Sequence, residues 1–126
     1  MIVVADASVG IQVALNRQSA AVLEAETVIV PDLYLVEVTN AAWQYLNFSE
    51  LSRGEVEELL EIALQLPDEI VASSELCLDA FALASAAKHP VYDMMYVALA
   101  RRNAIPLATA DRKLKRLAKK HGIEVV

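Results

Sequence analysis

The sequence predicts an α/β protein in which helices cover both faces of a central parallel sheet of about five strands. Two observations support this class. Short apolar runs rich in β-branched residues, typical of strands buried on both faces, alternate with longer segments of helical character. Strands that are separated by helices pair in parallel through right-handed crossovers. Ligands of such sheets bind beyond the carboxyl ends of the strands, so a site is expected at that edge.

The individual elements follow from the apolar patterns and from end signals. Strands are predicted at 2–5, 27–30, 70–72, 106–109 and 123–126. Helices are predicted at 7–17, 19–25, 32–48, 53–66, 75–87, 92–103 and 111–121. Pro31 ends the second strand because it cannot donate to a ladder. Ser52 and Glu55 predict a capping box at the start of helix 53–66, and Gly122 predicts the end of the last helix.

The size and composition of the chain indicate one domain over residues 1–126. The chain is 56% hydrophobic and 22% charged, with 3 Gly and 4 Pro, which excludes disordered and low-complexity classes. No apolar run approaches the ~18 residues of a membrane span, and the first residues do not resemble a signal peptide. The single cysteine, Cys77, suits a reducing compartment and is expected in the core. We therefore expect a soluble, cytoplasmic protein.

Helix 32–48 has almost no polar face. Leu33 and Trp43 lie on one side of it, and Val38 and Tyr45 lie on the other. A helix that is apolar nearly all round is buried on more than one side. In so small a domain one of those sides is expected to face a second subunit, which predicts a homodimer.

Four carboxylates stand where hydrophobic burial alone does not explain them. Asp6 directly follows the first strand, and Asp111 stands two residues beyond Thr109 at the end of another. Asp93 opens a helix whose next residues are apolar, and Glu37 lies inside the apolar helix 32–48. A carboxylate in such a place is costly unless it is paired or coordinated.

Each of these acids also has a structural interpretation. Asp6 and Asp111 fit N-caps of the helices that they precede, and Asp93 suits a helix N-terminus through the dipole. Glu37 fits neither interpretation. Several acids without a basic partner repel one another unless a hard cation holds them, and oxygen ligands of this kind suit Mg²⁺ or Mn²⁺. Asp6, Glu37, Asp93 and Asp111 are therefore candidate metal ligands.

Four strings of the sequence together resemble the motifs of PIN-domain proteins, and most of all the small VapC-type toxins of toxin–antitoxin pairs. The strings are VADAS at 4–8, PDLYLVEVTNAAW at 31–43, VYDMMYVALA at 91–100 and LATAD at 107–111. Each motif alone is weak, but together they span the chain in the family's order. The resemblance implies a PIN-like three-layer α/β/α fold.

The resemblance further implies a metal-dependent ribonuclease whose products carry a 5′-phosphate and a 3′-hydroxyl. Asp6, Glu37, Asp93 and Asp111 fall on the family's four acidic positions, which hold the ions and carry the catalysis. The family's supporting polar positions fall on Ser8, Asn40 and Thr109. Divalent ions at such a site bind the scissile phosphate and lower the pKa of the attacking water.

Two residues depart from the family pattern. Gln12 stands where many relatives have a lysine in the first helix, which alters the expected substrate contacts. Met94 follows the third acid, where relatives have a small residue, and it is expected to narrow the site. Neither change removes a candidate metal ligand.

Charge is distributed unevenly along the chain, whose net charge is −6. Residues 1–79 contain fourteen acidic and two basic residues, whereas residues 80–126 contain three acidic and nine basic residues. Most of these cations fit the solvated faces of helices. Arg112 and Lys113 directly follow Asp111, so we expect them to contact an RNA backbone, which phosphate contacts position without reading sequence.

An antitoxin partner is expected over the acidic pocket, with an Arg or Lys reaching the carboxylates. The family resemblance implies the partner, and the excess of acidic residues favours a cation from outside. Two other functions remain open: a catalytically silent PIN-like module that binds RNA or protein, and a metal-dependent phosphatase. His89 and His121 are too few for a zinc cluster and are expected at the surface.

Overall fold

The central sheet is parallel, as the sequence predicts. The computed structural model describes residues 1–16 and 19–126. Within these residues, a four-stranded sheet has the order β3-β2-β1-β4, with all pairs parallel. The strands are β1 Ile2–Ala5, β2 Thr27–Pro31, β3 Glu69–Val71 and β4 Leu107–Ala108. β1 lies between two neighbours, and its residues Val3, Val4 and Ala5 are completely buried.

The predicted fifth strand at 123–126 is reduced to one parallel bridge between Leu107 and Val125. The amide of Leu107 donates to the carbonyl of Glu124 at 2.9 Å, and the amide of Val126 donates to the carbonyl of Leu107 at 3.0 Å. Because β4 has only 2 residues, few of its backbone groups can pair with the chain at 123–126. The fold class is confirmed, and only the number of full strands differs.

The helices follow the predicted order, with small changes at their ends. The predicted helix 7–17 ends at Ala14, and its last predicted position, 17, lies outside the described residues. Ser52 and Glu55 form the predicted capping box, and Gly122 has the expected positive φ of 75° after the last helix. The bounds are α1 Ala7–Ala14, α2 Ala20–Leu23, α3 Leu33–Phe48, α4 Arg53–Gln65, α5 Cys77–Ala87, α6 Val91–Asn103 and α7 Arg112–Lys120, with a 3₁₀ turn at Ser73–Glu75.

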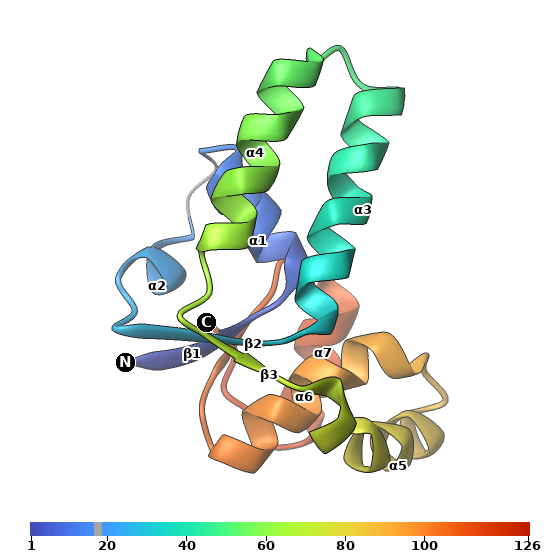
Figure 1. The fold of residues 1–126 in the computed structure, drawn as a ribbon. Helices are drawn as coiled ribbons and strands as arrows, with labels where there is room; N and C mark the ends of the chain where they lie inside the picture. The colour runs from blue at the N-terminus through green and yellow to red at the C-terminus, as the bar shows by residue number, and fades with distance from the viewer. Residues whose placement is uncertain (17–18) are drawn as a thin grey trace.

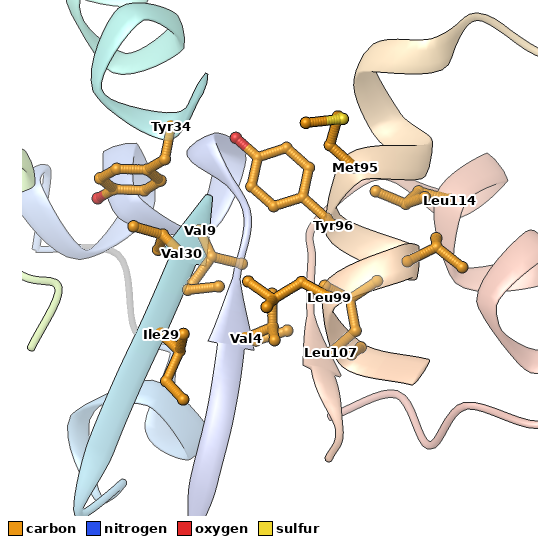
Figure 2. Packing of buried hydrophobic residues seen from close by; sticks show 14 of the residues in the cluster. Val4, Val9, Ile29, Val30, Tyr34, Met95, Tyr96, Leu99, Leu107 and Leu114 are labelled. Carbon is orange, nitrogen blue, oxygen red and sulfur yellow. The ribbon is translucent and has the colours of Figure 1, made fainter. Parts of the chain in front are cut away.

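Helices lie on both faces of the sheet. Figure 1 shows α1, α3 and α4 on one side and α5 and α6 on the other. In the core, Val9 and Tyr34 pack on one side of β1 and β2, whereas Tyr96 and Leu99 of α6 pack on the other (Figure 2). In the described part of the chain, no helix is long and apolar enough to cross a membrane.

One side of helix α3 is buried in the core, and the other side is exposed to solvent. Tyr34, Val38 and Ala42 are buried, whereas 67% of Val36 and 55% of Trp43 are exposed. The expected burial of this helix on more than one side is therefore not found within one chain. The second subunit predicted to cover the exposed side stays a prediction.

Cys77 corrects another expectation, because it is exposed rather than in the core. Helix α5 is apolar on two sides, and its core side carries Ala80, Leu83 and Ala84. Cys77, the first residue of the helix, and Phe81, one turn further on and 65% exposed, both lie outside the core. An apolar sequence pattern alone cannot tell which side of such a helix is buried.

Candidate active site

Asp6 lies at the carboxyl end of β1 and caps α1. Its carboxylate accepts hydrogen bonds from the Ser8 hydroxyl at 2.5 Å, from the Val9 amide at 3.1 Å and from the Thr109 hydroxyl. Thr109 reaches it because β1 and β4 are paired in register at Ala5 and Ala108. Asp6 is only 6% exposed. Burial is the main cause that raises its pKa, these hydrogen bonds lower it, and the nearby charge of Asp93 raises it again.

The two hydroxyl groups also tie the loop after β4 to the start of α1. The Ser8 hydroxyl accepts from the amide of Ala110 at 3.0 Å, and the Thr109 hydroxyl accepts from the amide of Asp111 at 3.0 Å. Thr109 is 3% exposed. Two of the three predicted supporting residues, Ser8 and Thr109, thus contact Asp6 directly.

Glu37 projects from α3 toward α6. It accepts a short hydrogen bond from the hydroxyl of Tyr96, which lies on α6 and is almost completely buried. Partial burial raises the pKa of Glu37, the Tyr96 bond lowers it, and the charges of Asp93 and Asp6 raise it further. Burial, followed by the charge of Glu37, also raises the pKa of Tyr96.

Tyr96 is a residue of this site that the sequence reasoning missed. It stands in the apolar run of α6, three residues beyond Asp93. A tyrosine in such a run usually indicates core packing. Its hydroxyl group is the one hint of a polar neighbour, because a buried hydroxyl usually finds a hydrogen-bond partner. Its bond to Glu37 links two elements that are 59 residues apart in the chain.

Asp93 is the third residue of α6 and is paired with His89. The Nε2 atom of His89 lies 2.7 Å from Oδ2 of Asp93. The His89 side chain is only 7% exposed, which corrects the expectation of a surface histidine. His121, the second histidine, is half-buried at the end of α7 and likewise does not lie fully at the surface.

Asp111 has the predicted capping role. Its Oδ1 atom accepts from the amides of Lys113 at 2.8 Å and Leu114 at 3.2 Å at the start of α7. The residue is exposed, and so are the neighbouring Arg112 and Lys113. Asp111 is joined to Asp6 through Thr109, which donates to Asp6 and accepts from the Asp111 amide.

The charge of Asp93 helps raise the pKa of both Asp6 and Glu37, and the charge of Asp6 also raises the pKa of Glu37, whereas Asp111 contributes to neither raised pKa. In residues 1–16 and 19–126, no Lys or Arg forms an ion pair with these three acids. Over the same residues, no three His, Cys, Asp or Glu side chains are arranged to hold a metal ion. Each carboxylate instead accepts hydrogen bonds from its own donors, so a common ligand set stays a prediction.

Two hollows lie beside the acids, and both are lined by Ala7, Ala41 and Gln44. One, of about 450 Å³, is also lined by Glu37 and Asn40. Asn40 is exposed there. The other hollow, of about 350 Å³, is lined in addition by Ser8, Ile11, Gln12, Leu15, Tyr45 and Ala110.

The two departures from the family pattern have different surroundings. Gln12 lines the hollow that contains Ser8. Met94 is completely buried and lines neither hollow. The expected narrowing by Met94 is therefore not seen in these two hollows.

Comparison with known proteins agrees with this fold. The family model of the PIN domain matches residues 3–120. Ribonuclease VapC3 of Pyrobaculum aerophilum is 34% identical over 101 residues, which are 79% of this chain and 77% of that protein. The chain therefore belongs to the PIN-domain family, and within that family it is similar to the VapC type.

Solved structures share the fold at low sequence identity. PAE2754 from Pyrobaculum aerophilum matches with a TM-score of 0.80 and 21% identity, covering 100% of this chain and 84% of that one. VapBC2 from Rickettsia felis, bound to a DNA fragment from its promoter, matches with a TM-score of 0.68 and 15% identity over 100% and 98% of the chains. FitAcB from Neisseria gonorrhoeae matches with a TM-score of 0.61 and 17% identity, covering 99% of this chain and 96% of that one.

Proposed function

We propose that the protein is an endoribonuclease dependent on Mg²⁺ or Mn²⁺, and that it is the toxin of a type II toxin–antitoxin pair in the cytoplasm. The observation that supports this is the buried carboxylate of Asp6, whose pKa is raised by burial and by the charge of Asp93, and whose own charge acts on Glu37. The family and the ribonuclease name of a relative support the substrate class.

The chemistry of these donors fits a divalent cation. Asp6, Glu37 and Asp93 offer oxygen atoms, and their mutual repulsion is relieved when a cation binds. Asp111 follows on the loop that Thr109 ties to Asp6 and completes the proposed ligands. A bound divalent ion supplies electrostatic activation of a phosphate and of water.

The other residues have supporting roles in this proposal. Ser8 and Thr109 fix the carboxylate of Asp6 by donating to it. Asn40 offers an amide to substrate in the hollow beside Glu37. Arg112 and Lys113 are exposed next to Asp111, where they are available to the phosphates of an RNA backbone.

The direct test is cleavage of mixed RNA with Mg²⁺ or Mn²⁺, with EDTA, and with an Asp6→Asn variant. Cleavage is expected with either metal, and it is expected to stop with EDTA and to fall at least about 100-fold in the variant, which corresponds to roughly 2.7 kcal/mol. Asp32→Asn is the matched control, because Asp32 also follows a strand but lies outside the charged group. It is expected to cleave at the wild-type rate.

The same assay separates the alternatives. A silent RNA-binding module retains RNA in a gel-shift experiment but cleaves none with any metal. A phosphatase instead hydrolyses p-nitrophenyl phosphate and leaves internal phosphodiester bonds intact. Either result would replace the ribonuclease proposal.

The proposal includes an antitoxin that covers the acidic site. Leu33 and Val36 line the hollow beside Glu37, so the apolar face of a partner helix has a place next to the carboxylates. A partner Arg is expected to bind two carboxylate oxygens at once. In a co-expressed complex, inhibition is expected to weaken when that Arg is changed to Ala, and Mg²⁺ is expected to compete. A partner whose basic residue is dispensable would contradict this mode of inhibition.

The proposal also includes a homodimer. Val36 and Trp43 expose an apolar side of α3 that is expected to be covered by a second copy. Sedimentation at micromolar concentration is expected to give the mass of two chains. A monomer under those conditions would contradict the dimer and leave the nuclease proposal intact.

A further inference from the structure

His89 occupies a tightly fixed position between α5 and α6. The residue before it, Lys88, is the C-cap of α5 in the left-handed region with φ 52°, and the residue after it, Pro90, is the N-cap of α6 with φ −56°. The amide of His89 donates to the carbonyl of Ala84 at 3.1 Å. The backbone position of His89 is therefore set by the junction of the two helices.

The imidazole is directed at one of the acids of the proposed site. Its Nε2 atom lies 2.7 Å from Oδ2 of Asp93, and its side chain is 7% exposed against 35% for Asp93. A carboxylate accepts hydrogen bonds only, so Nε2 carries the proton and donates. Within the described residues, no hydrogen bond involves Oδ1 of Asp93, which leaves that oxygen available to another ligand.

The second nitrogen of the His89 ring, Nδ1, is buried and has no hydrogen-bond partner within the described part of the fold. A buried polar atom without a partner lowers the stability of the fold, and such atoms call for an explanation.

We propose that His89 is a positioning residue: by holding Oδ2 of Asp93 through Nε2, it fixes the carboxylate whose Oδ1 would be a ligand of the proposed divalent cation. This inference rests on the proposed metal site. Partners that hydrogen-bond to a ligating carboxylate fix its orientation, and their loss typically weakens metal binding. His89 stands four residues before Asp93 and belongs to none of the four motif strings, the third of which begins two residues after it.

The alternative is a purely structural pair that stabilises the start of α6. Side chains four residues apart interact in this way on many helices, and their loss changes stability only. Binding of Mn²⁺, measured by calorimetry on the folded full chain, separates the two roles because it does not depend on turnover. Thermal unfolding of the same samples reports the structural contribution.

The decisive variants are His89→Leu and His89→Gln. Leucine fills the space without a donor, whereas the amide of glutamine can donate from nearly the same place as Nε2. His89→Leu is expected to bind Mn²⁺ about 10- to 100-fold more weakly, and His89→Gln to retain most of the affinity. His121→Leu, at the end of α7, is the matched control and is expected to bind like the wild type.

Two further measurements keep the inference testable if the leucine variant does not fold. His89→Asn is also polar and neutral, but its amide is one carbon too short to reach Asp93, so it is expected to behave like leucine. In an Asp93→Asn background, the change of His89 to Gln or Asn is expected to have no additional effect on Mn²⁺ affinity.

The outcomes distinguish this inference from the proposed function. If the wild type binds Mn²⁺ and the leucine, asparagine and glutamine variants bind it equally well, the positioning role is overturned while the metal site stands. Equal weakening by glutamine and leucine would also overturn it, since the donor would then be irrelevant. A wild-type chain that binds no Mn²⁺ would overturn the metal site and this inference together.

Discussion

Asp6 and Asp32 occupy equivalent places in the fold but have opposite electrostatic surroundings. Each follows a parallel strand, β1 or β2, and each directly precedes a helix. Burial raises the pKa of Asp6, whereas hydrogen bonds from Ser73 lower the pKa of Asp32. The strand–Asp–helix pattern is thus the same, and the groups that the fold brings to each carboxylate decide what it can do.

The difference has a clear physical cause. Asp32 accepts from the hydroxyl of Ser73, and no other acid contributes to its pKa. Asp6 is buried next to Asp93, and its negative charge is therefore costly. A bound cation would offset that cost at Asp6. It would stabilise Asp32 little, because hydrogen bonds already stabilise the charge there. This contrast is the basis of the following four predictions.

The largest expected effect is stabilisation by Mn²⁺. A ligand present at a hundred times its dissociation constant stabilises the folded state by about 2.7 kcal/mol. Thermal unfolding of the wild type with Mn²⁺ and with EDTA is expected to show this difference. Asp6→Asn is expected to lose most of it, and Asp32→Asn is expected to keep it. Equal stabilisation of both variants would remove the distinction between the two aspartates.

Gly10 lies in α1, the helix that Asp6 caps, and packs closely against Tyr34. A Cβ atom at Gly10 would lie 2.2 Å from the Tyr34 hydroxyl oxygen, and that hydroxyl donates to the carbonyl of Ala63 at 2.6 Å. Gly10→Ala is therefore expected to lower the free energy of unfolding by about 1–3 kcal/mol. Urea denaturation of the variant and of the wild type measures this loss of unfolding free energy.

Gly54 is the matched control for this substitution. It lies in the first turn of α4, and a Cβ atom there meets nothing within 4 Å. Gly54→Ala is expected to raise the free energy of unfolding by roughly 0.4–1 kcal/mol, because alanine restricts the unfolded chain. A destabilised Gly54→Ala variant would show that the loss at Gly10 is not specific to the contact with Tyr34.

A smaller effect is expected from Tyr96→Phe. The change removes the donor to Glu37 but keeps the ring in the core. Because Glu37 is only half-buried and regains water, the loss of unfolding free energy at neutral pH is expected to be about 1 kcal/mol. The pKa of Glu37, followed by NMR titration, is expected to rise further. Tyr45→Phe is the control, and an unchanged Glu37 titration in Tyr96→Phe would contradict the prediction.

The smallest expected effect is the change in melting temperature, without metal, when either aspartate is replaced by asparagine. The folded-state pKa of Asp6 lies above its ordinary value of 3.8, so its charge costs stability once the pH rises through that raised pKa. Asp6→Asn is thus expected to raise the melting temperature by a few degrees at neutral pH.

Asp32 is expected to show the reverse sign. Its folded-state pKa lies below 3.8, so its contribution is present above that value and is lost as the pH falls through the lowered pKa. Asp32→Asn is expected to lower the melting temperature slightly at neutral pH and to have no effect in strong acid. Melting curves recorded from acid to neutral pH check both signs, and a shift of the same sign in both variants would contradict the comparison.

Much of the fold could be predicted because its signals are local. The apolar run before Asp6, the proline that ends β2 and the capping box of α4 each act over a few residues, and each is found in the structure. The short fifth strand was less predictable, because its pairing depends on how much edge the distant β4 leaves open.

The structure confirms the capping roles of Asp6 and Asp111, whereas the ligand roles of the four acids stay predictions and the side-chain contacts around them could not be predicted. The positions of Asp6 and Asp111 at strand ends predicted both their caps and their candidacy as ligands. The histidine beside Asp93 and the tyrosine beside Glu37 gave no comparable signal. His89 was expected at the surface, yet the turn between α5 and α6 buries it against Asp93.

The sequence by itself determined which elements form, because strand and helix periods, caps and proline stops are properties of neighbouring residues. Only the tertiary structure decided which carboxylates share an environment, since Asp6, Glu37 and Asp93 are far apart along the chain and meet through β1, α3 and α6. It also decided which side of α3 and of α5 is buried. Burial and charge act through space, and for that reason two aspartates with the same local pattern acquired opposite pKa shifts.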